Sequence, residues 1–210
     1  DTQYPSLIAP TKASEMQRWL TVRPLPSTEP IEQRAIHLVR SLVAARIAGV
    51  PLTFATDVIS GDAGLVRPDG APTPLYLPWR TSTLALQGTK YVGSLRMKNQ
   101  STNHIFERNG EGIVVLMAPE PTTETMNLGD KVVLQEIWGR QTPLPRIDGR
   151  QLIPVSQTPV FLTGCAAQLP KWDLAVGFEN TRLASLRGAQ PNRSEEHTSE
   201  LQSHSFISYA

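Results

Sequence analysis

Residues 54–95 decide the fold and read FATDVISGDAGLVRPDGAPTPLYLPWRTSTLALQGTKYVGSL. This stretch starts inside a short apolar run, continues through a long loop and reaches a segment of helical character that ends at Gly88. After Gly88 the pattern changes to short runs of Val, Ile, Leu and Tyr separated by turn residues. One continuous stretch therefore joins a strand–loop–helix unit to a β-rich region.

The segment before this stretch predicts a strand at residues 19–22 and a helix at residues 29–48. Apolar residues recur in the helix at three- and four-residue steps, namely Ile31, Ala35, Leu38, Val39, Leu42 and Val43. We expect Thr28 to cap the helix, Pro30 to occupy its first turn and Gly49 to end it. A helix with one apolar stripe packs that stripe against a core.

Residues 52–58 predict a second strand, and their near-uniform apolar character is typical of a strand buried on both faces of a parallel sheet. Residues 60–78 predict a long loop that contains the turn Arg67-Pro68-Asp69-Gly70. A second helix is expected from Trp79 to Gln87. The order strand, helix, strand, helix is that of an α/β unit.

The region after Gly88 predicts an antiparallel sandwich or barrel, because short strands follow one another at regular spacing. The Gly-containing segments Asn109-Gly110-Glu111-Gly112 and Asp148-Gly149 predict hairpin turns. The expected strands are 90–96, 103–108, 112–118, 124–128, 131–138, 150–155 and 159–163. The expected organisation is an α/β part (1–88), a β-sandwich (89–165), a linker or the start of a further domain (166–192) and a tail (193–210).

The composition excludes several classes of protein. The chain has 210 residues, a formal net charge of +1 and a single cysteine, Cys165. The near-neutral charge argues against a nucleic-acid partner, and one cysteine cannot form an internal disulfide or a multi-cysteine metal site. No apolar run approaches the roughly 20 residues of a membrane-spanning helix. We therefore expect no nucleic-acid or membrane partner, no metal and no cofactor, and the oligomeric state stays open.

The last 18 residues read RSEEHTSELQSHSFISYA and resemble an in-frame translation of a sequencing adapter. Residues 193–203 and 207–210 match its two constant blocks, with a barcode-sized gap between them. We therefore expect a non-native, disordered tail whose residues carry no functional information. Without the tail the chain keeps 19 basic and 16 acidic side chains.

Candidate functional residues are few. Asp57 and Asp62 follow the second predicted strand, where carboxylates could bind sugar hydroxyls or transfer protons, although Asp also favours loop and turn positions for structural reasons. Trp79 could stack on a sugar ring, although core packing is the commoner role of such a residue. Cys165 has no activating base nearby in sequence, so a buried thiol is the simpler interpretation.

Residues 54–95 resemble the last strand, loop and helix of a (β/α)₈ barrel in clan-A-like glycoside hydrolases. The motifs that carry the resemblance are the Gly64-Leu65 and Asp69-Gly70-Ala71-Pro72 loop and the Tyr91-Val92-Gly93-Ser94 entry to a C-terminal β-sandwich. The segments 112–116, 128–130, 137–140 and 159–164 look like that accessory sandwich. The resemblance implies an α/β fragment, the last βα units of a TIM-like barrel, followed by an all-β antiparallel sandwich.

The resemblance also implies that the catalytic residues lie elsewhere. In this family the nucleophile is a Glu at the end of strand seven, which would fall near Val22 or Arg23, and neither is a carboxylate. Either the parent protein is catalytically degenerate or the strand is shifted, in which case Glu15 and Glu29 are the nearby alternatives.

We assign no catalytic residue, and only Asp57, Asp62 and Trp79 as substrate-binding candidates. The expected function is that of an inactive fragment of a glycoside-hydrolase-like protein that acts on or binds carbohydrate. The alternative is a non-catalytic carbohydrate-binding or structural module. An exported, extracytoplasmic parent protein is implied by the resemblance alone.

Overall fold

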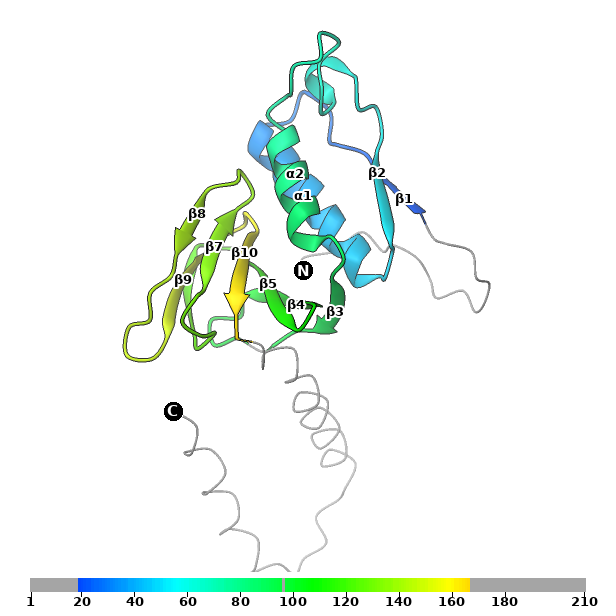
Figure 1. The fold of residues 1–210 in the computed structure, drawn as a ribbon. Helices are drawn as coiled ribbons and strands as arrows, with labels where there is room; N and C mark the ends of the chain where they lie inside the picture. The colour runs from blue at the N-terminus through cyan, green and yellow to red at the C-terminus, as the bar shows by residue number, and fades with distance from the viewer. Residues whose placement is uncertain (1–18, 96, 167–210) are drawn as a thin grey trace, which may run out of the picture. The chain divides into compact units, whose positions relative to one another are not determined.

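The computed structural model describes residues 19–95 and 97–166, and all of them belong to one compact unit (Figure 1). The described part is mostly β-strand with few helices, and most of its strands pair antiparallel. The expected segment 167–192 and the adapter-like tail lie outside the described residues. None of the described helices has the length and apolar character needed to cross a membrane.

The first half of the described chain alternates strands and helices. Strand β1 (Trp19–Val22) and strand β2 (Leu52–Ala55) pair in parallel, with Trp19 opposite Leu52 and Val22 opposite Ala55. Helix α1 (Ile31–Ile47) connects them, and helix α2 (Tyr76–Leu86) follows β2 after a loop that contains a short 3₁₀ turn (Gly61–Ala63). The predicted order of strand, helix, strand and helix is confirmed.

Helix α1 corrects one detail of the sequence prediction. The predicted apolar stripe is buried except for Ile31 in the first turn, which is exposed, and Gly49 takes the left-handed conformation that ends the helix. The prediction that Thr28 caps the helix is wrong, because Pro30 itself is the N-cap residue and no side chain caps the free backbone N–H groups. Glu29 instead closes a turn through a backbone hydrogen bond to the Pro26 carbonyl.

Strand β2 is shorter and more exposed than predicted. It ends at Ala55 because Asp57 adopts a left-handed backbone with φ +50°, which cannot continue an extended strand. The expected burial on both faces is wrong for the described residues, since Leu52 and Phe54 are exposed on the face away from the helices. The apolar run therefore indicates a face that the described chain leaves uncovered.

The second half of the chain is antiparallel, as predicted. A six-stranded sheet has the order β3–β4–β5–β10–β7–β8, and β6 pairs with β9 in a separate two-stranded sheet. The strands are β3 (Lys90–Gly93), β4 (Thr102–Arg108), β5 (Glu111–Met117), β6 (Thr122–Met126), β7 (Val133–Glu136), β8 (Gln141–Pro143), β9 (Gln151–Val155) and β10 (Val160–Cys165). Seven of these strands match predicted ones, and β8 was not predicted.

The predicted turn at Asn109-Gly110 is confirmed. Both residues have positive φ angles, +54° and +82°, and they connect β4 to β5 as a two-residue hairpin loop. This geometry is that of a type I′ turn, which favours Asn followed by Gly.

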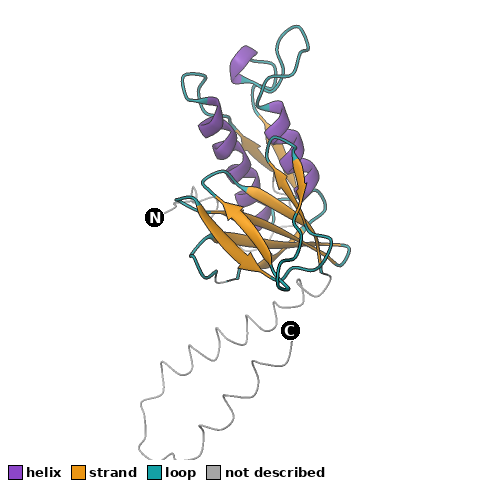
Figure 2. Cartoon of the chain, turned by 90° about the vertical axis from the view of Figure 1, so that its left-hand side faces the viewer, coloured by secondary structure: helices purple, strands orange, loops and turns teal. Residues whose placement is uncertain are grey.

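Two hydrophobic cores lie on opposite faces of the six-stranded sheet. The helix-side core joins α1 and α2 to sheet residues such as Phe106, Ile113 and Phe161. The sheet-side core joins the other face, including Val114 and Leu162, to the β6–β9 pair. In Figure 1 the helices lie between the β1–β2 pair and the six-stranded sheet, and Figure 2 shows the strands of the β-rich half beneath the helices.

Two arginines fasten the helices to the β-rich half. Arg40 of α1 donates a hydrogen bond to the Gln157 carbonyl at 2.9 Å. Arg108 of β4 donates to the carbonyls of Leu84 and Gln87 at the end of α2, each at 3.1 Å. A cation that binds the last carbonyls of a helix compensates the negative end of its dipole. Polar contacts thus add to the shared core in holding the two halves together.

Candidate functional site

The carboxyl ends of β1 and β2 meet at one edge because the two strands are parallel. The Thr56 amide donates to the Val22 carbonyl at 3.1 Å and extends the ladder to this edge. Arg23 directly follows β1, and its Nη2 lies 3.9 Å from Oδ2 of Asp57, which follows β2. Both side chains are largely exposed, so this ion pair contributes little to stability and its groups remain open to solvent.

The loop that carries Asp57 and Asp62 folds back on itself. The amides of Leu65 and Val66 both donate to the Val58 carbonyl, at 3.0 and 2.9 Å. A Cβ on Gly64 would lie only 2.6 Å from the carbonyl oxygens of Asp57 and Val58, so no residue larger than glycine fits there. Local hydrogen bonding therefore holds this loop in a compact form.

Asp62 lies in the 3₁₀ turn of the same loop. Its Oδ1 lies 3.5 Å from Nε of Arg67, and the carboxylate is exposed. The structure thus places Asp57 and Asp62 on one loop at one edge of the β1–β2 pair, each beside an exposed arginine. Ionised carboxylates accept hydrogen bonds from hydroxyl groups, and guanidinium groups donate them. This edge therefore exposes both hydrogen-bond acceptors and hydrogen-bond donors.

Arg34 is a residue of this edge that the sequence analysis missed. It is only 4% exposed, and it donates from Nε to the Leu25 carbonyl at 3.2 Å and from Nη2 to the Asp62 carbonyl at 2.7 Å. A signal was present, since Arg34 falls on the apolar stripe beside Ile31, Ala35 and Leu38. A charged residue on such a stripe is buried only with a specific partner.

Trp79 does not join the exposed carboxylates. It lies in the first turn of α2, half-buried, and packs against the helix-side core. A sugar-stacking role for Trp79 stays a prediction, and its contacts with the core favour a packing role.

Neither position expected for a nucleophile at the end of β1 carries a carboxylate. Val22 is buried in the core, Arg23 is exposed, and Glu29 lies in the turn before α1 and outside the strand. Glu15 lies outside the described residues. Among residues 19–95 and 97–166, no three His, Cys, Asp or Glu side chains gather as a metal-binding group.

Cys165 is buried, and its Sγ lies 3.8 Å from the Leu162 carbonyl. Burial, reinforced by the charge of Glu111, raises the pKa of the Cys165 thiol to about 12. A thiol with this pKa is not a nucleophile at neutral pH.

The face of the β1–β2 pair that points away from the helices is apolar and open. Trp19 is 66% exposed and Phe54 48% exposed, and their ring centroids lie 5.7 Å apart. Leu52 is exposed as well. Large apolar side chains gathered on one exposed face mark a surface that binds another apolar surface.

A cavity of about 260 Å³ lies at the opposite, amino end of β2, between the C-terminal halves of α1 and α2. Its lining includes Leu42, Arg46, Thr53 and Leu86. It also includes Ser82, whose buried Oγ has no hydrogen-bond partner among the described residues. This cavity is separate from the edge that carries Asp57 and Asp62.

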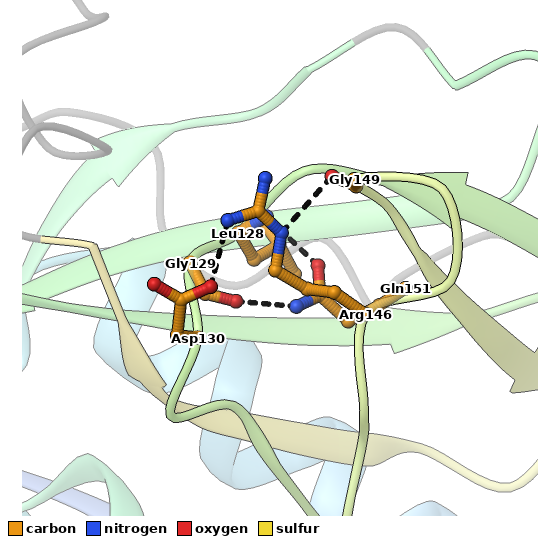
Figure 3. Close-up of polar contacts among 6 residues, drawn as sticks. All are labelled: Leu128, Gly129, Asp130, Arg146, Gly149 and Gln151. Atoms are coloured by element: carbon orange, nitrogen blue, oxygen red, sulfur yellow. Dashed lines mark hydrogen bonds and ion pairs between the residues drawn. The ribbon is translucent and has the colours of Figure 1, made fainter. Parts of the chain in front are cut away.

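A second polar cluster, shown in Figure 3, ties a loop of the β-rich half to β9. The buried Gln151 accepts a hydrogen bond from the Leu128 amide at 3.0 Å and donates to the Gly129 carbonyl. Arg146 donates to the Gly149 carbonyl at 3.2 Å and pairs with Asp130 at 2.7 Å. The bonds of Gln151 and the Arg146–Asp130 pair join the loop after β6 to β9 and to the loop before it, and the Arg146–Gly149 bond closes that second loop, so the cluster has a structural role.

Comparison with known proteins identifies the fold. No protein-family profile matches the chain, and no curated protein matches it. A family 39 glycoside hydrolase from the gut symbiont Bacteroides cellulosilyticus WH2 matches with a TM-score of 0.56 and 20% identity, over 69% of this chain and 33% of that one. A GH30 endoxylanase from Clostridium papyrosolvens C71 matches with a TM-score of 0.53 and 13% identity, over 70% and 42%.

The fold is similar to part of a glycoside hydrolase. A family 30 subfamily 8 xylanase from Clostridium acetobutylicum gives the same TM-score of 0.53 at 11% identity, over 70% of this chain and 42% of that one. The chain spans about a third to two-fifths of the length of these glycoside hydrolases. At these identities the similarity concerns the fold alone.

Proposed function

We propose that this chain is the end of a (β/α)₈ barrel and the accessory β-sandwich of an exported glycoside-hydrolase-like protein that acts on carbohydrate. In this proposal β1, α1, β2 and α2 are the last two βα units of the barrel. The observation that carries the proposal is the β1–β2 pair, which is parallel, covered by helices on one face and open on the other.

The open face of β1–β2 corresponds to the inside of a barrel. Parallel sheets occur almost only with both faces covered, and a two-stranded sheet alone is marginally stable. In a closed barrel the inward side chains of all strands fill the interior. Further parallel strands of the parent protein would bury Trp19 and Phe54 in that interior.

The edge that carries Asp57 and Asp62 corresponds to the catalytic face. Barrel enzymes hold their sites at the carboxyl ends of the strands, in the loops that follow them. We assign Asp57 and Asp62 to a sugar subsite there, where their exposed oxygens accept hydrogen bonds from sugar hydroxyls.

The catalytic carboxylates belong to parts of the barrel outside this chain. Retaining and inverting glycosidases both need a pair of carboxyl groups across the scissile bond. Two of eight βα units cannot position such a pair, so we expect no turnover of any aryl glycoside by the 210-residue chain. Measurable turnover would overturn this part of the proposal.

The binding role is tested by titrating the chain with soluble xylan in a calorimeter, because two of the structures similar in fold are xylanases. We expect weak, saturable binding that the double substitution Asp57→Asn and Asp62→Asn reduces at least tenfold. Glu120→Gln is the matched control, since Glu120 is an exposed carboxylate in the loop between β5 and β6. Equal affinity for xylan in the double variant and in the control would contradict the assignment of Asp57 and Asp62 to a sugar subsite.

A second candidate function is a non-catalytic carbohydrate-binding or structural module. The observation that favours it is the absence of a carboxylate at Val22 and Arg23, where the resemblance implies a nucleophile. The two candidates are separated by recovering the upstream coding sequence. The resemblance to clan-A-like glycoside hydrolases implies an acid/base Glu at the end of the fourth barrel strand. A Glu at that position favours the hydrolase, and its absence favours the module.

A further inference from the structure

We propose that Arg34 is a positioning residue that holds the loops after β1 and β2 in one fixed arrangement at the candidate site. This inference rests on the proposed function for its effect on carbohydrate binding. The coupling of the two loops is inferred from the contacts of Arg34 alone and does not depend on the proposed function.

The guanidinium of Arg34 joins two loops that are far apart in sequence. Nε binds the Leu25 carbonyl, in the loop after β1, and Nη2 binds the Asp62 carbonyl, in the loop after β2. The side chain is 4% exposed, and the structure places no carboxylate within ion-pair distance of it in the residues it describes. Backbone carbonyls of the two loops therefore bind this buried positive charge.

Neither helix formation nor packing explains an arginine at this position. Arg34 lies in the first turns of α1, near the positive end of the helix dipole, where a cation is unfavourable. A buried charge is costly unless it is hydrogen-bonded. The contacts with Leu25 and Asp62 offset these two costs, and the planar guanidinium offers several N–H donors in a fixed geometry that a lysine lacks.

The contact with Asp62 fixes its backbone and does not involve its carboxylate. Arg34 binds the carbonyl oxygen, while the carboxylate of Asp62 faces the exposed Arg67. On the other loop, Arg34 binds Leu25, two residues beyond the Arg23 that faces Asp57. Arg34 therefore sets the relative position of the two exposed arginine–aspartate pairs without touching either carboxylate.

The experiment compares Arg34→Met, Arg34→Lys and Arg40→Met in the full 210-residue chain. Arg40 is the matched control, because it is an arginine of the same helix that also donates to a backbone carbonyl, that of Gln157. Amide hydrogen exchange is followed by mass spectrometry in the two loops, in α1 and in β5. Xylan affinity is measured on the same samples.

We expect Arg34→Met to speed exchange at least tenfold at the amides of Leu65 and Val66 and in the 23–29 loop, with α1 and β5 unchanged. Arg34→Lys keeps the charge, but a single ammonium group cannot bind both carbonyls. We therefore expect at most one of the two loops to exchange more slowly than in Arg34→Met. Arg40→Met leaves both loops at the wild-type rate. Xylan affinity falls at least tenfold in Arg34→Met and stays unchanged in Arg40→Met.

Other results would contradict either the role of Arg34 or the proposed function, and the two cases can be told apart. Wild-type exchange in both loops of both Arg34 variants overturns the inference, and so does acceleration spread evenly over α1, β5 and the loops. If Arg34→Met does not fold, Arg34→Lys decides by the same criterion. Faster loop exchange in a chain whose wild type does not bind xylan upholds the positioning role of Arg34 and overturns the proposed function.

Discussion

Gly164 of β10 lies directly against the backbone carbonyl of Lys131, and a Cβ at position 164 would overlap that oxygen. Gly164 also has a φ of +69°, and it lies in an irregularity of the pairing between β10 and β5. A glycine in such a bulge allows two backbones to approach closely.

Gly164→Ala is therefore expected to destabilise the chain by about 3 kcal/mol or more, since the substitution adds both a clash and a strained φ. Gly49→Ala is the control. Gly49 has a nearly identical φ of +70° but nothing within 4 Å of its Cβ position, so we expect a loss of about 1 kcal/mol. Urea denaturation measures both, and equal losses would show that the contact with Lys131 has no energetic effect.

Glu124→Ala is expected to lower the free energy of unfolding by about 3 kcal/mol. Glu124 is fully buried in β6, and its carboxylate accepts hydrogen bonds from the amides of Asn99 at 3.2 and 3.3 Å and Ser101 at 3.2 Å. Its removal leaves two backbone donors without a partner. Glu120→Ala, at an exposed position, should change stability by less than about 0.5 kcal/mol in the same titration. Similar values for the two variants would contradict the prediction.

The stability of the chain should fall in mild acid because of His104. Burial lowers the pKa of His104 from 6.5 to about 4. The folded state therefore holds a neutral imidazole that the unfolded chain protonates. The contribution of His104 to the free energy of unfolding is fully present above pH 6.5 and is lost as the pH falls towards 4. The loss is at most about 1.4 kcal/mol per pH unit.

The measurement for His104 is the free energy of unfolding in urea at several pH values between 4 and 7. His104→Gln should show a shallower slope over this interval than the wild type. His37 is a less buried histidine whose pKa is also lowered by burial, so His37→Gln should change the slope less. An unchanged slope in His104→Gln would rule out His104 as the titrating group.

Cys165 should react with a thiol reagent only when the chain unfolds. The thiol is buried and its pKa is raised to about 12, so the thiolate is scarce at neutral pH. Labelling with a chromogenic disulfide at pH 7 should proceed at least a hundredfold faster in urea than in buffer. Rapid stoichiometric labelling of the folded chain would contradict the burial of Cys165.

Ser82→Ala is expected to be neutral or stabilising by up to about 1 kcal/mol, although Ser82 is fully buried. Its Oγ has no partner among the described residues, so alanine removes a desolvated hydroxyl without breaking a hydrogen bond. Thermal unfolding checks the sign. A clear loss of stability would mean that the hydroxyl is satisfied, for example by an ordered water in the adjoining cavity.

The sequence predicts those elements whose signals are local. The stripe of α1, the Asn109-Gly110 turn and the alternating strands are visible because each depends on neighbours a few residues away. Strand β8 was missed because Gln141, Thr142 and Pro143 are all exposed and carry no apolar alternation. The early end of β2 was missed because it depends on the left-handed conformation of Asp57. Asp tolerates this conformation, but the presence of an Asp does not predict it.

The candidate site shows the same division. Asp57 and Asp62 could be proposed from sequence because they follow a predicted strand, and parallel strands bring their carboxyl ends together. Their pairing with Arg23 and Arg67 and the contacts of Arg34 depend on how separate loops fold over the end of α1. No spacing in the chain encodes these tertiary contacts.

The six-stranded sheet has one further consequence, which follows from the alternation of β5. Ile113 and Val115 face the helices, while Val114 and Leu116 face the β6–β9 pair. Adding or deleting one residue within β5 would exchange these two sets of side chains and leave both interiors mismatched at once. Over evolutionary time this strand can therefore accept replacements of similar size, whereas changes of length must be confined to the β4–β5 hairpin and to the loop that leads to β6.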